Sequence, residues 1–428
     1  MPAIPVDIQA VATEVEQHAD SAQTFRQYIT ELQQDKKLRG NTLTVLCQFL
    51  LARSATVPWL VHFYWLLLMP RFLNIAFTGG TCNSACRMCV GRKEGQPLQY
   101  VSLAQIRQML EHAITSDEVT LSSSDSDPLL NPDMLPILHE FDEQNISCDF
   151  YTNGLAMTSE LIDSLTCTNA VNMINFSLDA ISPELYREIR GRDLAKVQQH
   201  IQALCKSKTE RKRKRPWISL SMVELADNIE ELPELVEYAH SIGAFRVAVQ
   251  PLMHKKDDPV NQSALKNPNW AQAVMKAQTI AQQHDILLTL PGKLQHALAS
   301  TLETIPQTSI QEDQTTHSSI TATPTETNDL NSELSTPAQE ITCCTWLRGI
   351  WISIDGTIRP CCMNSSEDFG QIYEGPLNNN QIFLTKKIQL LTSKVFPSCL
   401  TYMTQCAYLS ALQKQGIPVQ QFVVGKPK

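Results

Sequence analysis

The order of apolar and polar positions divides the chain into segments of different kinds. Residues 1–71 carry apolar positions at helical spacing, which predicts an N-terminal helical segment. Over residues 72–297, short apolar runs alternate with amphipathic stretches. The runs predicted as strands are Leu73–Thr78, Glu118–Leu121, Cys148–Thr152, Asn172–Leu178, Trp217–Val223 and Phe245–Pro251. The stretches predicted as helices include Ser102–His112, Pro132–Gln144, Ser159–Leu165, Leu194–Cys205, Ile229–Ile242 and Trp270–His284. This alternation predicts an α/β fold with a parallel sheet, a full or partial (β/α) barrel of about six units.

The pattern breaks down after this region and then resumes. Residues 298–340 include a stretch rich in Thr, Ser, Gln, Pro and Glu without an aromatic residue, which predicts a disordered linker. Residues 341–428 are predicted to form a small C-terminal α+β domain. Within it, Asp355 and Gly356 are expected to form a type I′ turn between two short strands.

The charge balance narrows the class of protein. Of 428 residues, 18% are charged, and the net charge is −9, which argues against a general nucleic-acid binder. The basic run Lys206–Arg215 is interpreted as a solvated loop rather than a phosphate-binding patch. The apolar stretch Val57–Leu73 is interpreted as a buried helix, with a helix lying on a membrane surface as the alternative. We therefore expect no membrane contact.

The 13 cysteines are clustered, and nine of them fall into two groups at 82–89 and 343–406. The polar, acidic residues 1–20 lack the apolar core of a signal peptide. Clustered cysteines in an unsecreted protein indicate metal ligands or redox thiols, so we expect a cytoplasmic protein.

The first group places Cys82, Cys86 and Cys89 in a C-x3-C-x2-C pattern directly after the first predicted strand. This position is the carboxyl edge of the sheet, where barrel enzymes build their sites. Three thiolates on one short loop can ligate three irons of a [4Fe–4S] cluster and leave the fourth iron open. A zinc site would need a fourth protein ligand, and none lies nearby in the sequence.

This loop and the segments after it resemble the radical S-adenosylmethionine superfamily. The segments are Asp125-Ser-Asp-Pro, Tyr151-Thr-Asn-Gly, Phe176-Ser-Leu-Asp and Ile189-Arg-Gly, in the order in which the family carries such motifs. The resemblance implies that the open iron of the cluster binds S-adenosylmethionine, which is then cleaved to a 5′-deoxyadenosyl radical. It also implies a reducing partner such as flavodoxin or ferredoxin.

The resemblance assigns two cofactor-binding residues. Asp127 stands where the family has the glutamate of Gly-Gly-Glu-Pro, which accepts a hydrogen bond from the methionine amino group. The family's glycines are replaced here by Asp125 and Ser126. Ser177 is expected to contact the cofactor carboxylate or ribose, with a serine capping the next turn as the alternative.

The second group resembles the SPASM or twitch extension of radical enzymes, which carries an auxiliary iron–sulfur cluster. Cys343, Cys361, Cys399 and Cys406 match this pattern, although the neighbouring Cys344 and Cys362 leave the ligand choice open. Four ligands favour one auxiliary cluster. Buried cysteines or a four-thiolate zinc site are the alternatives.

These expectations lead to an oxidoreductase-like radical enzyme that abstracts a hydrogen atom from a small molecule or a peptide. The alternative is an iron–sulfur scaffold or electron-transfer protein that has lost cofactor cleavage. No general acid or base can be chosen among His254, His284 and His296. The sequence identifies neither the substrate nor the oligomeric state.

Overall fold

The described strands form one open sheet. The computed structural model describes residues 70, 72–89, 91, 95–113, 116, 118–123, 125–253, 260–304, 349–360, 367–377, 380, 382–383 and 386. Within these residues the sheet has ten strands in the order β10-β9-β1-β3-β4-β5-β6-β7-β8, with β2 paired to β1. Their bounds are β1 Phe72–Gly79, β2 Gln99–Tyr100, β3 Glu118–Ser123, β4 Ser147–Thr152, β5 Val171–Ser177, β6 Trp217–Val223, β7 Arg246–Gln250, β8 Leu287–Thr289, β9 Gly349–Ile352 and β10 Ile358–Arg359. β9, β1 and β3 to β8 run parallel, whereas β2 and β10 are antiparallel to their neighbours. The described strands therefore form an open, largely parallel sheet that matches the sheet of a partial barrel.

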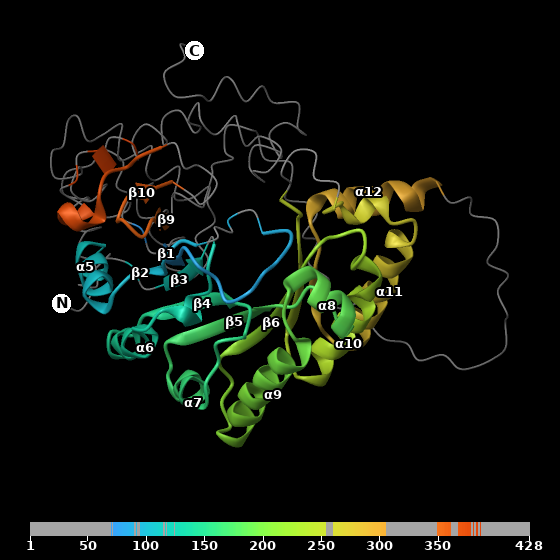
Figure 1. Cartoon of the computed structure of the whole chain (residues 1–428), viewed down its shortest axis with the longest axis horizontal. Helices are drawn as coiled ribbons and strands as arrows, with labels where there is room; N and C mark the ends of the chain where they lie inside the picture. The colour runs from blue at the N-terminus through green and yellow to red at the C-terminus, as the bar shows by residue number, and fades with distance from the viewer. Residues whose placement is uncertain are drawn as a thin grey trace, which may run out of the picture.

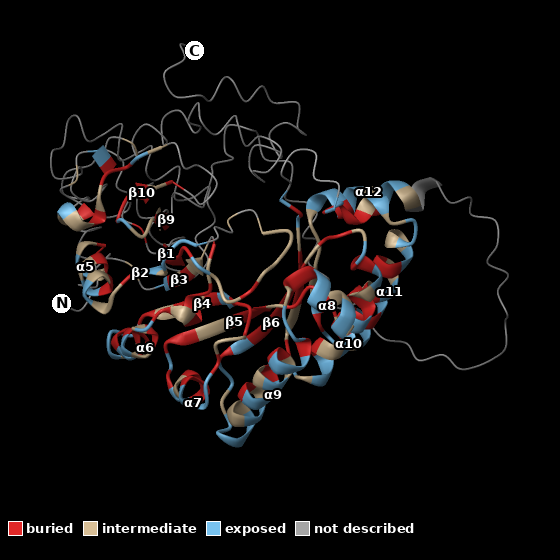
Figure 2. Ribbon diagram, in the orientation of Figure 1, coloured by how far each residue is buried: buried red, intermediate tan, exposed pale blue. Residues whose placement is uncertain are grey.

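The two faces of this sheet differ because side chains alternate along each strand. One face is apolar and meets the helices, as in the buried register row Phe150, Ile174 and Ile218. The opposite, concave face is largely polar, as in the row Asn175, Ser219 and Arg246. Figure 2 shows the buried residues concentrated on the strands and on the sides of the helices that face them.

Helices cover the apolar face and follow the strands in alternation (Figure 1). Each predicted helix is present, with ends shifted by a few residues, and α8 and α12 are additions that the sequence pattern did not indicate. The bounds are α5 Leu103–His112, α6 Met134–Glu143, α7 Ser159–Cys167, α8 Pro183–Arg190, α9 Leu194–Glu210, α10 Leu232–Ser241, α11 Trp270–Gln283 and α12 Gly292–Thr304. Local signals fix several starts. Ser102 and Gln105, for example, form a reciprocal capping box at α5.

The described hairpin of the C-terminal segment pairs with the central sheet. β9 pairs in parallel with β1, from Phe72 opposite Gly349 to Ile75 opposite Ile352. Ile350 and Ile352 are buried in the same core as the parallel strands. Further along, the Gln108 side chain of α5 donates to the Tyr373 carbonyl (3.0 Å). Strand β9 and the buried residues around it therefore belong to the central sheet and its core.

The hairpin itself was predicted correctly, but its turn type was not. A type I′ turn needs a positive φ at both central residues, and only Gly356 has one (φ 87°). The Gly356 amide donates to the Ser353 carbonyl (2.9 Å), and the Ser353 amide donates to the Thr357 carbonyl (2.9 Å). This is the pattern of a longer loop closed by a left-handed glycine.

The boundary of the predicted linker also changes. Residues 298–304 continue helix α12, and Leu298 is buried against the core. Apolar residues at helical spacing, Leu294 and Leu298, explain why the helix extends this far. The remaining linker residues and the predicted N-terminal segment up to residue 69 lie outside the described residues. Among the described helices, none has the length and apolarity that crossing a membrane requires.

Candidate metal centre and cofactor site

The three cysteines of the first group lie together on the loop that follows β1. Cys82, Cys86 and Cys89 are all partly buried free thiols. In Figure 1 this blue segment crosses from β1 toward α8, above the carboxyl ends of the parallel strands. The structure thus places the loop at the edge of the sheet where the sequence predicted a site.

Backbone hydrogen bonds hold the cysteine loop against the end of α8. The Ala85 amide donates to the Arg190 carbonyl (3.0 Å), and the Arg87 amide donates to the Ile189 carbonyl (2.9 Å). Gly191 caps α8 in the left-handed conformation (φ 64°), and a Cβ there would lie only 2.8 Å from the Ala85 Cβ. The Ile189-Arg-Gly motif is therefore explained by its close contact with the loop.

A buried ion pair supports this contact from below. Arg190 donates through Nε to the Asp179 carboxylate (2.6 Å), and the other Asp179 oxygen accepts from the Val223 amide (2.7 Å). Burial disfavours the charge on Arg190, but the adjacent Asp179 carboxylate more than offsets this and raises its pKa. Losing one partner would leave an unpaired buried charge, at a cost of about 3–5 kcal/mol. Asp179, the last residue of the Phe176-Ser-Leu-Asp motif, therefore positions Arg190.

Polar groups of the protein lie next to two of the sulfur atoms, those of Cys82 and Cys86. The Ser84 amide donates to Cys82 Sγ (3.4 Å), and the Ser84 hydroxyl lies 3.3 Å from Cys86 Sγ. The Asn153 side-chain amide lies 3.8 Å from Cys82 Sγ and donates to Asn83 Oδ1 (2.7 Å). Donors of this kind stabilise negative charge on sulfur ligands.

The chemistry of these thiols fits an iron–sulfur cluster. Burial raises the pKa of the Cys82 thiol, and nearby Asp127, Cys86 and Cys89 raise it further. A bound cation reverses this preference because a coordinating thiol is deprotonated. In the described part of the chain, no three His, Cys, Asp or Glu side chains are grouped closely enough to hold a metal ion. The fit therefore rests on three thiols sharing one loop and on their donors.

Asp127 occupies a different environment from the one that the resemblance implies. Its carboxylate is 2% exposed and accepts hydrogen bonds from the Asn153 amide (2.6 Å), the Leu129 amide (3.0 Å) and the Thr152 hydroxyl (3.0 Å). Burial raises the pKa of Asp127, although these donors oppose the shift. In this structure its side chain joins the end of β3 to the end of β4.

The other parts of the same segment lie against the cysteine loop. The Ser126 hydroxyl donates to the Thr81 carbonyl (2.6 Å). A Cβ on Gly79 would lie 3.1 Å from the Asp125 carboxylate and 2.8 Å from the Ile354 side chain. Gly79 therefore lets the strand end, the aspartate segment and the tip of the C-terminal hairpin approach each other closely.

Ser177 ends β5 at the same edge of the sheet. It is partly buried and lies opposite Ser221 in the register of β5 and β6. Among the described residues, the Ser177 hydroxyl has no hydrogen-bond partner. It is not the turn cap of the alternative interpretation, and its hydroxyl can still bind a ligand.

Several other sequence candidates do not meet at this site. His284 stacks on His240 (ring centroids 3.9 Å apart) between α10 and α11, and His296 lies on α12. His254 lies outside the described residues. The second cysteine group also lies outside them, namely Cys343, Cys344, Cys361, Cys362, Cys399 and Cys406.

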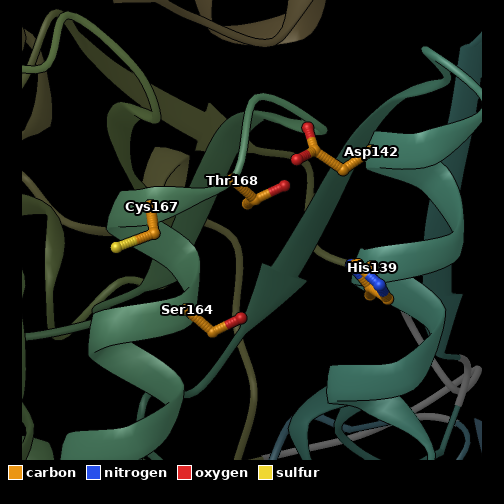
Figure 3. Close-up of a pocket in the computed structure, with 5 residues that line it drawn as sticks. All are labelled: His139, Asp142, Ser164, Cys167 and Thr168. Carbon is orange, nitrogen blue, oxygen red and sulfur yellow. The ribbon is translucent and has the colours of Figure 1, made fainter.

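A small pocket is present elsewhere, between α6 and α7 (Figure 3). It is lined by His139, Asp142, Ser164, Cys167 and Thr168. The Asp142 carboxylate there accepts a hydrogen bond from the Asn169 amide (2.8 Å), which joins the two helices. The pocket contains none of the residues that surround the cysteine loop.

Asn153, Asp179 and Arg190 belong to motifs that carried the family resemblance, but the sequence assigned these three residues no role. Their positions at strand or helix ends were the only available signal. Their partners, Cys82, Val223 and the cysteine loop, are 44 to 106 residues away, so only the fold shows the contacts.

Comparisons with known proteins agree with this geometry. Residues 77–241 match the family model "Radical SAM superfamily". The tungsten-containing aldehyde ferredoxin oxidoreductase cofactor-modifying protein of Pyrococcus furiosus is 24% identical over 194 residues, 45% of this chain and 54% of that protein. The probable GTP 3′,8-cyclase of Methanocaldococcus jannaschii is 26% identical over 193 residues, 44% of this chain and 61% of that protein. The chain thus spans between half and two thirds of these curated relatives.

A solved structure shows the same fold. The crystal structure of Streptococcus suis SuiB bound to S-adenosylmethionine aligns over 80% of this chain and 72% of its own, with a TM-score of 0.54 and 13% identity. The family match covers the cysteine loop and the motifs that pack around it. The chain therefore carries a Radical SAM superfamily domain at residues 77–241.

Proposed function

We propose that this protein holds a [4Fe–4S] cluster through Cys82, Cys86 and Cys89 and cleaves S-adenosylmethionine to start radical chemistry on a substrate. The observation that carries the proposal is the cysteine loop, fixed to α8 above the carboxyl ends of the strands. Such a cluster, when bound and reduced, supplies the electron that cleaves the cofactor. A reducing partner such as flavodoxin or ferredoxin is part of the proposal.

The residues of the chain would hold and orient the reactants. Ser84 and Asn153 donate toward the sulfurs, while Arg190 and Gly191 fix the loop. Ser177 offers a free hydroxyl at the same edge for the cofactor. Asp127 would act on cofactor binding indirectly, because its buried carboxylate joins the strand ends that border the site. Its hydrogen bonds to Thr152 and Asn153 support this indirect role.

The substrate class has two sources of support. SuiB has been crystallised with the precursor peptide SuiA, and that structure aligns with this chain at a TM-score of 0.51. The curated relatives are named for cofactor modification and for GTP cyclisation. We therefore propose hydrogen abstraction from a small molecule or a peptide, with net oxidation of the substrate.

An auxiliary iron–sulfur cluster on Cys343, Cys361, Cys399 and Cys406 is a further part of the proposal. It is supported by the hairpin β9–β10, which separates Cys343 from Cys361 in the sequence and is anchored on β1. The Cys82, Cys86 and Cys89 to Ala variant should then retain about four irons per chain. Zinc in that variant would indicate a structural site, and an iron-free variant would mean that no auxiliary cluster exists.

The proposed activity is tested by anaerobic reconstitution with iron and sulfide, reduction with dithionite and addition of S-adenosylmethionine. We expect 5′-deoxyadenosine to form. A reconstituted protein that binds iron but forms no 5′-deoxyadenosine would instead support an iron–sulfur scaffold or electron-transfer protein.

A further inference from the structure

A hydrogen-bonded row of polar side chains crosses the concave face of the sheet below the cysteine loop. Arg246 on β7 donates through Nε to the Ser219 hydroxyl on β6 (3.0 Å), which donates to Asn175 Oδ1 on β5 (2.8 Å). The Asn175 amide donates in turn to the Ser221 hydroxyl (2.7 Å). Three strands therefore hold the Arg246 side chain in one orientation, and a fixed guanidinium loses less conformational entropy on binding.

The guanidinium of Arg246 is partly buried, and it donates no hydrogen bond to a carboxylate of the described residues. Its other polar contact runs from Nη2 to the thioether sulfur of Met173 (3.4 Å), a weak acceptor. Among the described residues, no carboxylate forms an ion pair with it. The acid on the same face, Asp149, accepts instead from the Asn172 amide (2.9 Å). The positive charge of Arg246 acts on Asp149 and opposes the rise that burial causes in the pKa of Asp149, but no direct hydrogen bond joins the two side chains. The guanidinium therefore keeps hydrogen-bonding capacity for an anion.

The surroundings of Arg246 offer exposed apolar surface. Leu287, its register partner on β8, is 54% exposed, and Trp217, the register partner of Met173, is 43% exposed. The guanidinium also lies 5.5 Å from the ring centroid of Phe245. A cation between apolar side chains suits an organic anion better than a hydrated inorganic ion.

The position of this guanidinium is compatible with a ligand that reaches the proposed cofactor site. Arg246 contacts Met173, which lies four residues before Ser177 on β5. At about 3.3 Å per residue the separation along the strand is roughly 13 Å. A ligand roughly 13 Å long could therefore touch Arg246 at one end and reach the carboxyl edge of the sheet with the other.

We propose that Arg246 binds an anionic group, a carboxylate or a phosphate, of an organic ligand on the concave face. The inference rests on the proposed function only in identifying this ligand as the substrate. A planar guanidinium binds either anion through two parallel hydrogen bonds, which a lysine cannot reproduce.

The test is isothermal titration calorimetry of the full-length reconstituted protein with two probes, inorganic phosphate and succinate. We expect saturable binding of at least one probe, and the preferred probe distinguishes phosphate from carboxylate. Arg246→Gln should weaken that binding by at least about tenfold, as expected for a charged hydrogen bond of roughly 1.5–3 kcal/mol. Arg246→Lys should give an intermediate affinity, and it serves as the informative variant if Arg246→Gln does not fold.

Arg215→Gln is the matched control. Arg215 is an exposed arginine just before β6 that, like Arg246, acts on Asp149 through its charge but takes no part in the hydrogen-bonded row. It therefore controls for the loss of one positive charge near the site. We expect its affinity to stay within twofold of the wild type. Unchanged binding in both Arg246 variants, loss of binding in Arg215→Gln, or no saturable binding of either probe would overturn the inference. Failure of the wild type to form 5′-deoxyadenosine would overturn the proposed activity. The anion site would still be decided by the calorimetric titrations alone.

Discussion

The two faces of the central sheet carry different side chains, although the same strands form both. Toward the helices, rows such as Phe150, Ile174 and Ile218 are buried and apolar. On the concave face and at the carboxyl edge, Asn175, Ser177 and Arg246 are polar. Burial of the apolar face supplies most of the favourable free energy of folding, whereas the polar face contributes little of it. The comparison teaches that stability and chemistry are assigned to alternate positions of one strand.

The largest expected effect on stability comes from the apolar face. Phe176→Ala removes a fully buried ring and should lower the free energy of unfolding by about 3–5 kcal/mol. Tyr151→Ala, on the concave face with 42% exposure, should cost less than about 1 kcal/mol. Urea denaturation measures both. Equal losses would contradict the division between the faces.

The next effect concerns the contact between α8 and the cysteine loop. Gly191→Ala and Gly243→Ala both place a side chain at a positive φ (64° and 68°), which costs about 1–3 kcal/mol. Only at Gly191 does the new Cβ also meet Ala85 at 2.8 Å, whereas nothing lies within 4 Å at Gly243. Gly191→Ala should therefore lower the free energy of unfolding by at least about 1 kcal/mol more than Gly243→Ala does.

The same pair of variants tests the link between this contact and the metal centre. Gly191→Ala should lose iron to a chelator faster than the wild type, because the loop that carries the cysteines is displaced. Gly243 follows the C-terminal end of α10, away from the cysteine loop in the sequence, so Gly243→Ala should release iron at the wild-type rate. Identical iron-release rates in the two variants would show that the loop does not depend on α8.

A smaller effect on stability is expected from alanine substitution of two serines that lie opposite each other on β5 and β6, Ser177 and Ser221. Ser177→Ala should change the free energy of unfolding by less than about 0.5 kcal/mol, yet weaken S-adenosylmethionine binding by roughly fivefold, as for one lost hydrogen bond. Ser221→Ala leaves the buried Asn175 amide without its partner and should cost about 1–3 kcal/mol. Equilibrium dialysis and urea denaturation give both quantities, and the reverse pattern would remove Ser177 from the site.

The smallest expected effect follows cleavage of the chain. We expect a specific protease site introduced between residues 310 and 340, where the composition predicts a linker, to leave the two fragments associated after cutting. The reason is that β9 pairs with β1 and Ile350, Ile352 and Phe369 belong to the common core. Size-exclusion chromatography without denaturant should show one peak. Two separate peaks would support the independent C-terminal domain that the sequence suggested.

Local patterns predicted the parallel strands well because both their length and their buried face are written in short stretches. The β6 prediction, Trp217–Val223, agrees with the structure at both ends. The cysteine loop was placed correctly relative to β1 for the same reason. By contrast, the pairing of β1 with β9 joins Phe72 to Gly349, and no local pattern encodes a contact over that separation.

The environment of single side chains was the least predictable part. The sequence gives Asp127 a carboxylate but not its three donors, which come from a turn and from the end of β4. Likewise, nothing in the short Phe245–Pro251 run distinguishes Arg246 from a surface arginine until β5 and β6 lie beside it. Such contacts depend on register, and register is set by the whole sheet.

The central claim is that Cys82, Cys86 and Cys89 hold the cluster that cleaves S-adenosylmethionine. The most direct measurement is 5′-deoxyadenosine formation by the reconstituted triple Ala variant at these three positions. Its control is the double variant Cys167→Ala/Cys205→Ala, which changes two free cysteines outside the loop. We predict that the triple variant forms no 5′-deoxyadenosine while the double variant matches the wild type; undiminished formation by the triple variant would contradict the account.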